Sequence, residues 1–228
     1  PIALAAAALC GSTTAAPVIA LPSSSEASAF SDPVNELDLA ASARLRSLTV
    51  QDLGARVFQV GSQTSRAGRD ATLQSSVVAL GGDYARVRTD SRIDGKGGTS
   101  YLTAVYFADG ARMHDFRTIQ DHIAPKTTSD LLFKGAVSDT ARSVYSGLIR
   151  VGKEARGTNA YQTNRNLVLA EGAGAESVPN LAIENNDVLC SPATAAGPHE
   201  ARATHRTQLR GELRRVVTVN LQTRRLSW

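Results

Sequence analysis

Two histidine–aspartate pairs are the residues whose types and spacing could most directly do chemistry. His114 precedes Asp115, Asp121 precedes His122, and Arg117 lies between the two pairs. Imidazole and carboxylate groups can bind metal ions or exchange protons near neutral pH. The sequence marks no third ligand and no nearby serine or cysteine nucleophile. A hydrogen-bonded polar ladder on a β surface is therefore the preferred interpretation of these pairs.

Cys190 is the second candidate, and Ser191 and Pro192 follow it. A thiolate can bind iron or zinc, whereas a lone cysteine usually packs as a small apolar side chain. Cys10 is the only other cysteine in the chain. Two cysteines cannot build a disulfide framework or a cysteine-rich zinc site. A metal role for Cys190 therefore requires ligands from a second protein.

The composition describes the kind of core that must position these residues. Of the 228 residues, 42% are hydrophobic and 20% are charged, which predicts a folded chain with a packed core. Aromatic residues make up only 5%, so the core must depend on Ala, Val, Leu and Ile. No apolar run reaches the roughly 18 residues that a membrane-spanning helix needs, which excludes such a helix.

The net charge of +4 suggests nucleic-acid binding, but the charge is unevenly distributed. Residues 198–228 hold seven arginines and two glutamates, a net charge of +5, which leaves −1 for residues 1–197. A nucleic-acid-binding domain places its basic residues on the folded body, interleaved with aromatic residues. The main body of this chain offers no such patch, and we expect it to bind no nucleic acid.

The N-terminal 35 residues differ from the rest in composition. The chain begins with Pro1, which predicts a processed chain or a piece of a longer one. Residues 1–11 weakly resemble the apolar part of a secretion signal, but they lack its basic start and a clear cleavage pattern. Residues 11–35 are rich in Ser, Thr, Ala and Pro. We expect residues 1–35 to be irregular.

From residue 36 onward, short runs rich in β-branched residues recur between Gly, Asp and Asn turns, which predicts an all-β body. No window of ten or more residues between 36 and 190 has a convincing apolar period of 3.6 residues without a glycine interruption. The predicted strands are 45–51, 55–60, 73–80, 84–90, 101–107, 143–151, 166–170 and 178–184.

A weak repeat runs through this body, in which alanine follows a small or acidic turn and a strand comes next. The alanines are spaced irregularly, by 28, 40, 30, 14 and 20 residues, and lie at positions 43, 71, 111, 141, 155 and 175. Units of about 15–20 residues suit a β-helix, in which each coil contacts only its neighbours. A β-sandwich uses the same strands and turns. Periodicity alone slightly favours the sandwich, because sandwiches are commoner.

Three longer stretches resemble the SufB/SufD family of iron–sulfur cluster assembly proteins. They are HDFRTIQDHIAPKTTSDLLFKG at 114–135, YQTNRNLVL at 161–169 and SVPNLAIENNDVLC at 177–190. Shorter matches lie at 50–52, 68–73 and 79–83, so the resemblance runs from about Asn35 to Cys190.

The resemblance implies a right-handed parallel β-helix over residues 36–197, with an irregular N-terminal segment at 1–35 and a divergent arginine-rich tail at 198–228. It also implies a non-enzymatic scaffold in the cytoplasm. In this family SufB and SufD pair through their β-helices, and each docks a SufC ATPase subunit through a C-terminal helical region. An iron–sulfur cluster assembles transiently at the SufB–SufD interface.

Several phrases resemble the SufD branch of the family. The SufB branch carries a cysteine in the segment that matches residues 162–166, and this chain has none there. In SufD proteins a histidine that is a proposed cluster ligand follows the Cys-Ser pair, and Pro192 stands at that position here. The family's C-terminal helical phrases are not found after Gly197. A frameshift near residue 190 or a divergent C-terminus would explain this, and we expect SufC docking to be affected.

Two other functions compete with the scaffold. A β-helix enzyme acting on polysaccharide would use Asp115 and Asp121 as acid and base, often with calcium. A structural solenoid without any metal role is the third possibility. Of the chain's own residues, only Cys190 is predicted to contact metal, and we predict no stably bound cofactor.

Overall fold

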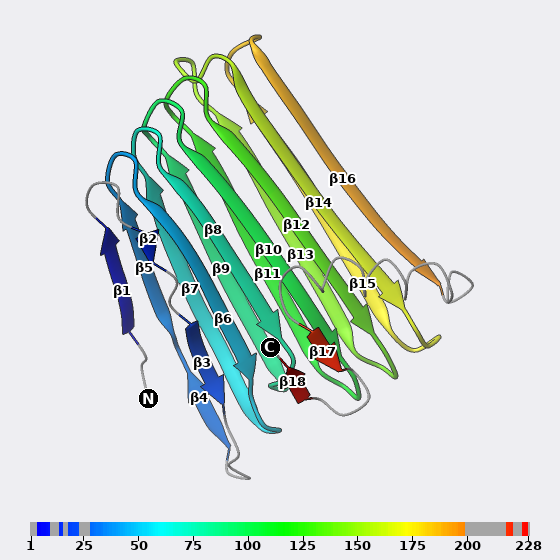
Figure 1. Cartoon of the computed structure of the whole chain (residues 1–228). Coiled ribbons are helices and arrows are strands. Elements are labelled where there is room, and N and C mark those ends of the chain that lie inside the picture. Colours follow the sequence, from blue (N-terminus) through cyan, green and yellow to red (C-terminus); the bar gives the residue numbers. More distant parts are fainter. Residues whose placement is uncertain are drawn as a thin grey trace.

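The computed structural model describes residues 28–198 without a gap, together with the segments 4–9, 14–15, 18–22, 218–220 and 225–227. The described residues form strands and turns and contain no helix, as predicted. None of them therefore belongs to a helix that could cross a membrane. The strands lie side by side in two layers that run the length of the molecule (Figure 1).

Two parallel sheets make up the body, and from β5 to β16 successive strands alternate between them. The first sheet contains β1 (Leu4–Leu9), β4 (Ala29–Ser31), β5 (Val34–Leu39), β7 (Val57–Ala67), β9 (Tyr84–Ile93), β11 (Met113–His122), β13 (Arg142–Val151) and β15 (Gly174–Ile183). The second contains β2 (Thr14–Ala15), β3 (Val18–Pro22), β6 (Arg44–Asp52), β8 (Thr72–Ala79), β10 (Thr99–Ala108), β12 (Thr128–Val137), β14 (Thr158–Val168) and β16 (Val188–Pro198).

Each coil of the chain is one strand from each sheet, and the next coil stacks on it in parallel. Tyr84 pairs with Met113, and Met113 pairs with Arg142, so one coil here is 29 residues long. This arrangement confirms the parallel β-helix. The slight preference for a sandwich drawn from periodicity alone was wrong, because a sandwich of short hairpins would be antiparallel.

The corners between the sheets form two columns of residues with left-handed backbone. One column is Ser42, Asp70, Gly97, Lys126 and Gly157, and the other is Arg56, Gly82, Gly110 and Asp139. In the first column each of these amides donates to a carbonyl of the following coil, as when Asp70 N donates to Lys96 O at 3.0 Å and Lys126 N to Arg156 O at 2.7 Å. The column thus joins consecutive coils outside the sheets.

The irregular alanine repeat comes from these two corners. Ala43 and Ala71 each follow a residue of the first column, whereas Ala111 and Ala141 follow turns of the second. Two successive alanines at the same column are therefore separated by about the length of one coil. Two successive alanines at different columns are separated by fewer or more residues. Ala43, Ala71 and Ala141 are fully buried, because only a small side chain fits inside the corner.

All eight predicted strands overlap observed ones, but the prediction from periodicity missed several strands. In the body of the chain, β5, β11, β12 and β16 have no counterpart in that prediction. In β11 the inward positions are His114, Phe116, Thr118, Gln120 and His122, so polar residues hide the alternation of apolar and polar side chains. A strand such as β11 gives a weak sequence signal, because the alternation of apolar and polar residues depends on an apolar buried side.

The N-terminal segment is not wholly irregular, which corrects the expectation for residues 1–35. Strand β1 pairs with β5, β3 pairs with β6, and β4 pairs with β7, all in parallel. The first full coil offers unpaired backbone groups, which an Ala- and Val-containing segment satisfies by adding strands. Of the tail at 198–228, the structure describes Pro198 and an antiparallel pair, β17 (Thr218–Asn220) and β18 (Arg225–Ser227). The rest of the tail lies outside the described residues.

The interior is built from stacked side chains of equivalent positions. In the middle coils four aromatic rings follow one another, with centroids 4.6, 5.6 and 5.5 Å apart: Tyr106, Phe116, Phe133 and Tyr145. Toward the N-terminal coils the stack is aliphatic and includes Leu39, Leu45, Leu73 and Ile93. Four of the eleven Phe, Tyr and Trp residues of the chain therefore lie in this stack.

Many interior positions are polar, and two of them are histidines. His122 Nδ1 lies 2.8 Å from Thr127 Oγ1 and its Nε2 lies 2.8 Å from Ser129 Oγ. His114 Nε2 lies 3.2 Å from the carbonyl oxygen of Gly81. Burial lowers the pKa of both histidines from 6.5 to about 4, because the interior disfavours a charged imidazolium.

These two histidines predict a loss of stability in mild acid. Their pKa values are lower in the folded chain than in the unfolded one, so the unfolded chain takes up protons first as the pH falls. We expect the free energy of unfolding to decrease by about 2 kcal/mol per histidine between pH 7.5 and pH 5. Urea denaturation at several pH values measures it. A His114→Gln/His122→Gln variant should have a much flatter pH profile, and an unchanged slope would contradict the assignment.

A second prediction concerns the close approach of β12 to the aromatic stack. A Cβ atom on Gly135 would lie 1.9 Å from Cε2 of Tyr106, whereas one on Gly152 would meet nothing nearer than 3.5 Å. We expect Gly135→Ala to lower the free energy of unfolding by about 1–3 kcal/mol, as overpacking does. Gly152→Ala is the matched control and should change it by less than about 0.5 kcal/mol. Equal effects in thermal denaturation would contradict the packing.

Candidate functional site

Cys190 lies on β16, in the last described coil, where its position pairs with Ala160 of β14. Its side chain is partly buried and packs against the apolar cluster that includes Ile149 and Val151. Burial raises the pKa of this thiol. The thiol form therefore predominates at neutral pH, and binding a metal would require a partner or the metal itself to stabilise the thiolate.

Pro192 lies two residues after Cys190 on the same strand, in register with Gln162. Alternation along a strand puts residues 190 and 192 on the same side of the sheet. The position that the family resemblance assigns to a histidine therefore adjoins Cys190, but proline offers no ligand atom. Within the part of the chain that the structure describes, no group of three or more His, Cys, Asp or Glu residues could hold a metal ion.

The two histidine–aspartate pairs do not form one cluster. All four residues lie on β11, and alternation turns His114 and His122 inward while Asp115 and Asp121 face outward. Asp121 forms an ion pair with Arg150 of the next coil, 3.2 Å from its Nε. The prediction of a polar ladder on a β surface therefore holds for the aspartates only, because the histidines belong to the interior.

Asp115 is the least exposed acidic group on the outer face of the first sheet, with 1% of its side chain accessible. It accepts hydrogen bonds from Arg86 Nε at 2.8 Å and from Arg117 Nε at 2.7 Å. The sequence interpretation missed this partnership between coils. The alternating pattern Arg86-x-Arg88-x-Asp90 was the available signal, since it places three charged side chains on one face of a strand.

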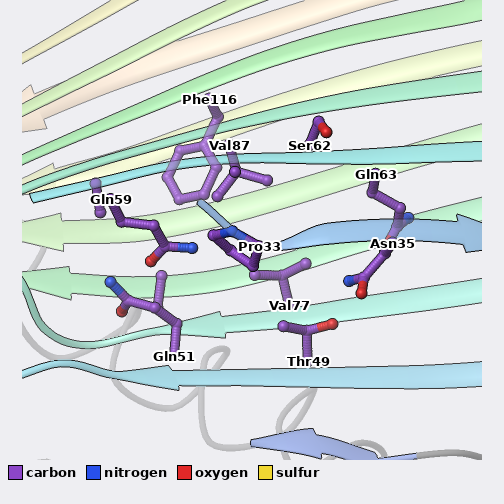
Figure 2. Close-up of a pocket in the computed structure, with 13 residues that line it drawn as sticks. Pro33, Asn35, Thr49, Gln51, Gln59, Ser62, Gln63, Val77, Val87 and Phe116 are labelled. Atoms are coloured by element: carbon purple, nitrogen blue, oxygen red, sulfur yellow. The ribbon is translucent and has the colours of Figure 1, made fainter. Parts of the chain in front are cut away.

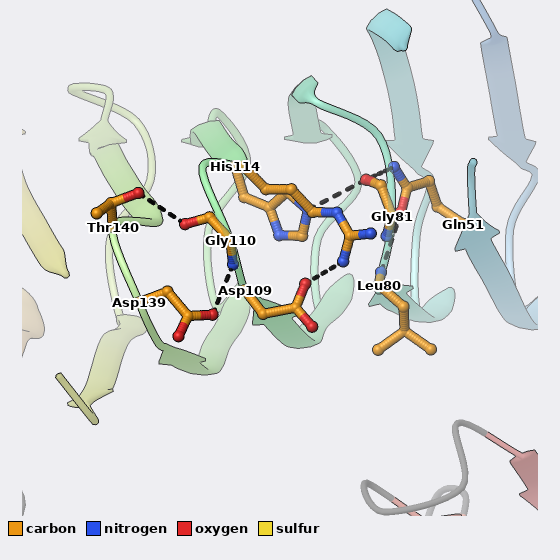
Figure 3. A network of polar contacts seen from close by, with 9 residues as sticks. Gln51, Leu80, Gly81, Asp109, Gly110, His114, Asp139 and Thr140 are labelled. Atoms are coloured by element: carbon orange, nitrogen blue, oxygen red, sulfur yellow. Dashed lines mark hydrogen bonds and ion pairs between the residues drawn. The ribbon is translucent and has the colours of Figure 1, made fainter. Parts of the chain in front are cut away.

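A polar clamp holds the corner that precedes β9 (Figure 3). The side-chain oxygen of Gln51 accepts from the amides of Leu80 and Gly81 at 3.0 Å each, and its amide nitrogen donates to Gly81 O at 2.7 Å. His114 donates through Nε2 to the same carbonyl, because a carbonyl can only accept. Gln51, Gly81 and His114 come from three consecutive coils, so the clamp ties these coils together.

The same corner continues toward the C-terminal coils. Gly110 N donates to Asp139 Oδ2 at 2.8 Å, and Thr140 Oγ1 donates to Gly110 O at 2.9 Å (Figure 3). The side chains of Asp109 and Arg112 form an ion pair within the turn. These polar groups hold the corner together, so their role is structural rather than catalytic.

A small cavity lies inside the N-terminal coils, between Pro33, Val77, Val87 and Phe116 (Figure 2). Its volume is about 30 Å³, enough for one or two water molecules. The buried atoms Gln59 Oε1 and Thr49 Oγ1 line it without a hydrogen-bond partner among the described residues. The cavity is too small for a metal cluster or an organic cofactor.

Residues 162–166, where the family resemblance places the cysteine of the SufB branch, contain part of a buried amide network. Asn166 Oδ1 accepts from the Tyr106 hydroxyl at 2.5 Å, and Asn166 Nδ2 donates to Asn164 Oδ1 at 2.7 Å. Ser177 also donates to Asn164 Oδ1. This network connects strands β10, β14 and β15. Asn164 and Asn166 therefore have a structural role in the interior.

The C-terminal end of the solenoid has open sheet edges. Among the described strands, β15 ends the first sheet and β16 ends the second, so each has an edge without a strand partner. Large apolar side chains at this end are well exposed; they are Val178, Leu181, Ile183 and Leu189. Open edges with exposed apolar side chains are prone to pair with another strand. Cys190 lies on one of these two edge strands.

Comparison with known proteins finds a matching family and related sequences. Residues 11–211 match the family model described as the SUF system FeS cluster assembly, SufBD core domain. An iron–sulfur cluster assembly SufBD family protein of Mycobacterium tuberculosis is 36% identical over 154 residues, which cover 64% of this chain and 39% of that protein. The iron–sulfur cluster assembly protein SufD of Escherichia coli is 33% identical over 128 residues, 56% of this chain and 30% of the relative.

A more distant relative, the SufD protein of Bacillus subtilis, is 24% identical over 138 residues, which cover 60% of this chain and 32% of that protein. The chain thus spans less than half the length of the curated relatives it matches. The family model, by contrast, covers most of the chain. The parallel β-helix is therefore the SufBD core domain, and the chain belongs to the SufBD family of iron–sulfur cluster assembly proteins.

Proposed function

We propose that this chain is a SufD-type scaffold subunit that pairs with a SufB-type protein and works with a SufC ATPase in the cytoplasm. In this proposal the chain catalyses no reaction itself. Its family membership supports a part in iron–sulfur cluster assembly. The absence of a cysteine from residues 162–166 supports the SufD assignment over SufB.

The single observation that carries the proposal is the open C-terminal end of the solenoid. Strands β15 and β16 each offer a row of backbone donors and acceptors, and four apolar side chains beside them are 40–65% exposed. A second β-helix with similar edge strands could continue both sheets and cover these side chains. Pairing of this kind would bury Cys190 within the interface between the two proteins.

Cys190 would then contribute one ligand to a nascent cluster, and the partner would supply the others. A lone thiol cannot hold a cluster, and Pro192 adds nothing to the ligand set. The cluster is therefore cargo that passes through the interface and is not a resident cofactor of this chain. The raised pKa of the Cys190 thiol fits this view, since the thiolate would form when metal displaces the proton.

The polysaccharide-active alternative has no geometric support. Asp115 and Asp121 are six residues apart on one strand, which separates their backbones by about 20 Å. Glycoside hydrolysis requires two carboxyl groups within about 5–9.5 Å of each other. Asp115 is also buried beneath two arginines, so it is not free to transfer a proton to a substrate.

Co-expression with the SufB and SufC proteins of the same organism, followed by affinity purification and native mass spectrometry, tests the proposal. We expect a complex that contains this chain and SufB. Val178→Lys should weaken that complex at least tenfold, because it puts a charge beside the β15 edge. Val60→Lys is the matched control, since Val60 is similarly exposed on the same sheet but lies on the interior strand β7.

Three results of this experiment would count against the proposal in different ways. A folded chain that retains neither protein would reject the scaffold function. A complex that Val178→Lys and Val60→Lys weaken equally would reject the open end as the interface. Recovery of SufB without additional SufC would support β-helix pairing and reject SufC docking by this chain.

The role of Cys190 predicts a separable effect. We expect Cys190→Ser to leave SufB binding unchanged and to lower the iron and sulfide content of the purified complex at least twofold. Serine is nearly the same size as cysteine but is a poor ligand for iron. Iron and acid-labile sulfide assays, together with visible absorption, measure this effect. Unchanged cluster content would reject Cys190 as a ligand without affecting the pairing.

A further inference from the structure

An open groove of about 570 Å³ lies on the outer face of the first sheet, across strands β9, β11, β13 and β15. Three arginines line the part of the groove over β9 and β11: Arg86, Arg88 and Arg117. We call this groove the arginine groove. Ile119 and Leu148 form an apolar portion of its lining, and Ser146 lines it next to Arg117, its partner in the ladder between β11 and β13. A groove of this volume is within the range of small-molecule sites.

The buried carboxylate of Asp115 fixes two of these arginines in place. Arg86 Nη2 lies 2.6 Å from Asp115 Oδ2, and Arg117 Nε lies 2.7 Å from Asp115 Oδ1. The arginine side chains are nevertheless 43% and 44% exposed, whereas the aspartate is 1% exposed. Asp115 thus binds both guanidinium groups from the buried side. Each guanidinium retains other N–H groups that can face the groove.

Arg88 adds a third guanidinium beside Arg117. The two residues are directly paired in the ladder between β9 and β11, where like charges repel. Arg88 turns along its own strand to Asp90, with Nη2 3.0 Å from Oδ2, and its side chain is 59% exposed. Three arginines and two aspartates leave the groove with one net positive charge, next to an apolar floor.

We propose that the arginine groove binds an organic oxyanion, a phosphate or carboxylate group attached to a small apolar body. The guanidinium groups donate hydrogen bonds to the oxyanion, since planar N–H pairs match both phosphate and carboxylate oxygens. Ile119 and Leu148 contact the apolar body. The arginines and the apolar residues of the groove lie on β9, β11 and β13, and Asn180 is its one lining residue on the edge strand β15, so this inference does not depend on the proposed function.

Isothermal titration of the full chain with phenyl phosphate, benzoate and inorganic phosphate tests the inference. We expect saturable binding of phenyl phosphate or benzoate with a dissociation constant of about 1 mM or lower, and weaker binding of inorganic phosphate, which lacks the apolar body. The stronger of the two organic ligands identifies the oxyanion. The titrations are done at constant ionic strength, so that general screening does not contribute.

Arg88→Gln should weaken binding of the stronger ligand about tenfold or more, because it removes one charged donor. Arg150→Gln is the matched control: Arg150 is 53% exposed on the same face and paired with Asp121, but it does not line the groove. Leu148→Ser should reduce the preference for the organic ligands over inorganic phosphate. Circular dichroism melting verifies that each variant is folded.

Two outcomes would overturn the inference. One is the lack of saturable binding of any of the three probes to the folded wild-type chain. The other is an equal loss of affinity in Arg88→Gln and Arg150→Gln, which would indicate general attraction to a positively charged face. Unchanged ligand preference in Leu148→Ser would overturn the apolar contact and leave a site that recognises the oxyanion alone.

Discussion

The structure depends on the hydrogen bonds that each coil makes to the next. Within the sheets these bonds are the parallel ladders, and at one corner they are the amides of Ser42, Asp70, Gly97 and Lys126. A left-handed residue turns the chain sharply and leaves its N–H pointing along the solenoid axis toward the neighbouring coil. Every other feature follows from this stacking, because it places equivalent side chains above one another.

Stacking gives a polar interior a structural use. The side-chain amide of Gln51 forms hydrogen bonds with Gly81 of the next coil, and His114, one coil further on, donates to the carbonyl oxygen of Gly81. Each polar side chain thus connects coils in a way that an aliphatic one could not. The cost is sensitivity to protonation, because His114 and His122 must remain neutral to stay inside.

The sequence predicted β10 and β13, whose buried positions include large apolar side chains, and it missed β11, whose buried side includes two histidines and a glutamine. It found the corner alanines but could not divide them into two columns, because that requires the register between coils. The family motifs identified the β-helix. The ion pair between Asp115 and Arg86 joins residues 29 positions apart, a distance at which spacing alone gives no guidance.

The aromatic stack is confined to the middle coils, between Tyr106 on β10 and Tyr145 on β13. In a solenoid each coil is stabilised only by its neighbours, so the stability of the chain varies along its axis. Backbone amides of β10–β13 should therefore exchange their hydrogens most slowly, and those of β15 and β16 should open first. A protein that docks on the terminal coil would meet the most adaptable part of the molecule, held against a rigid centre.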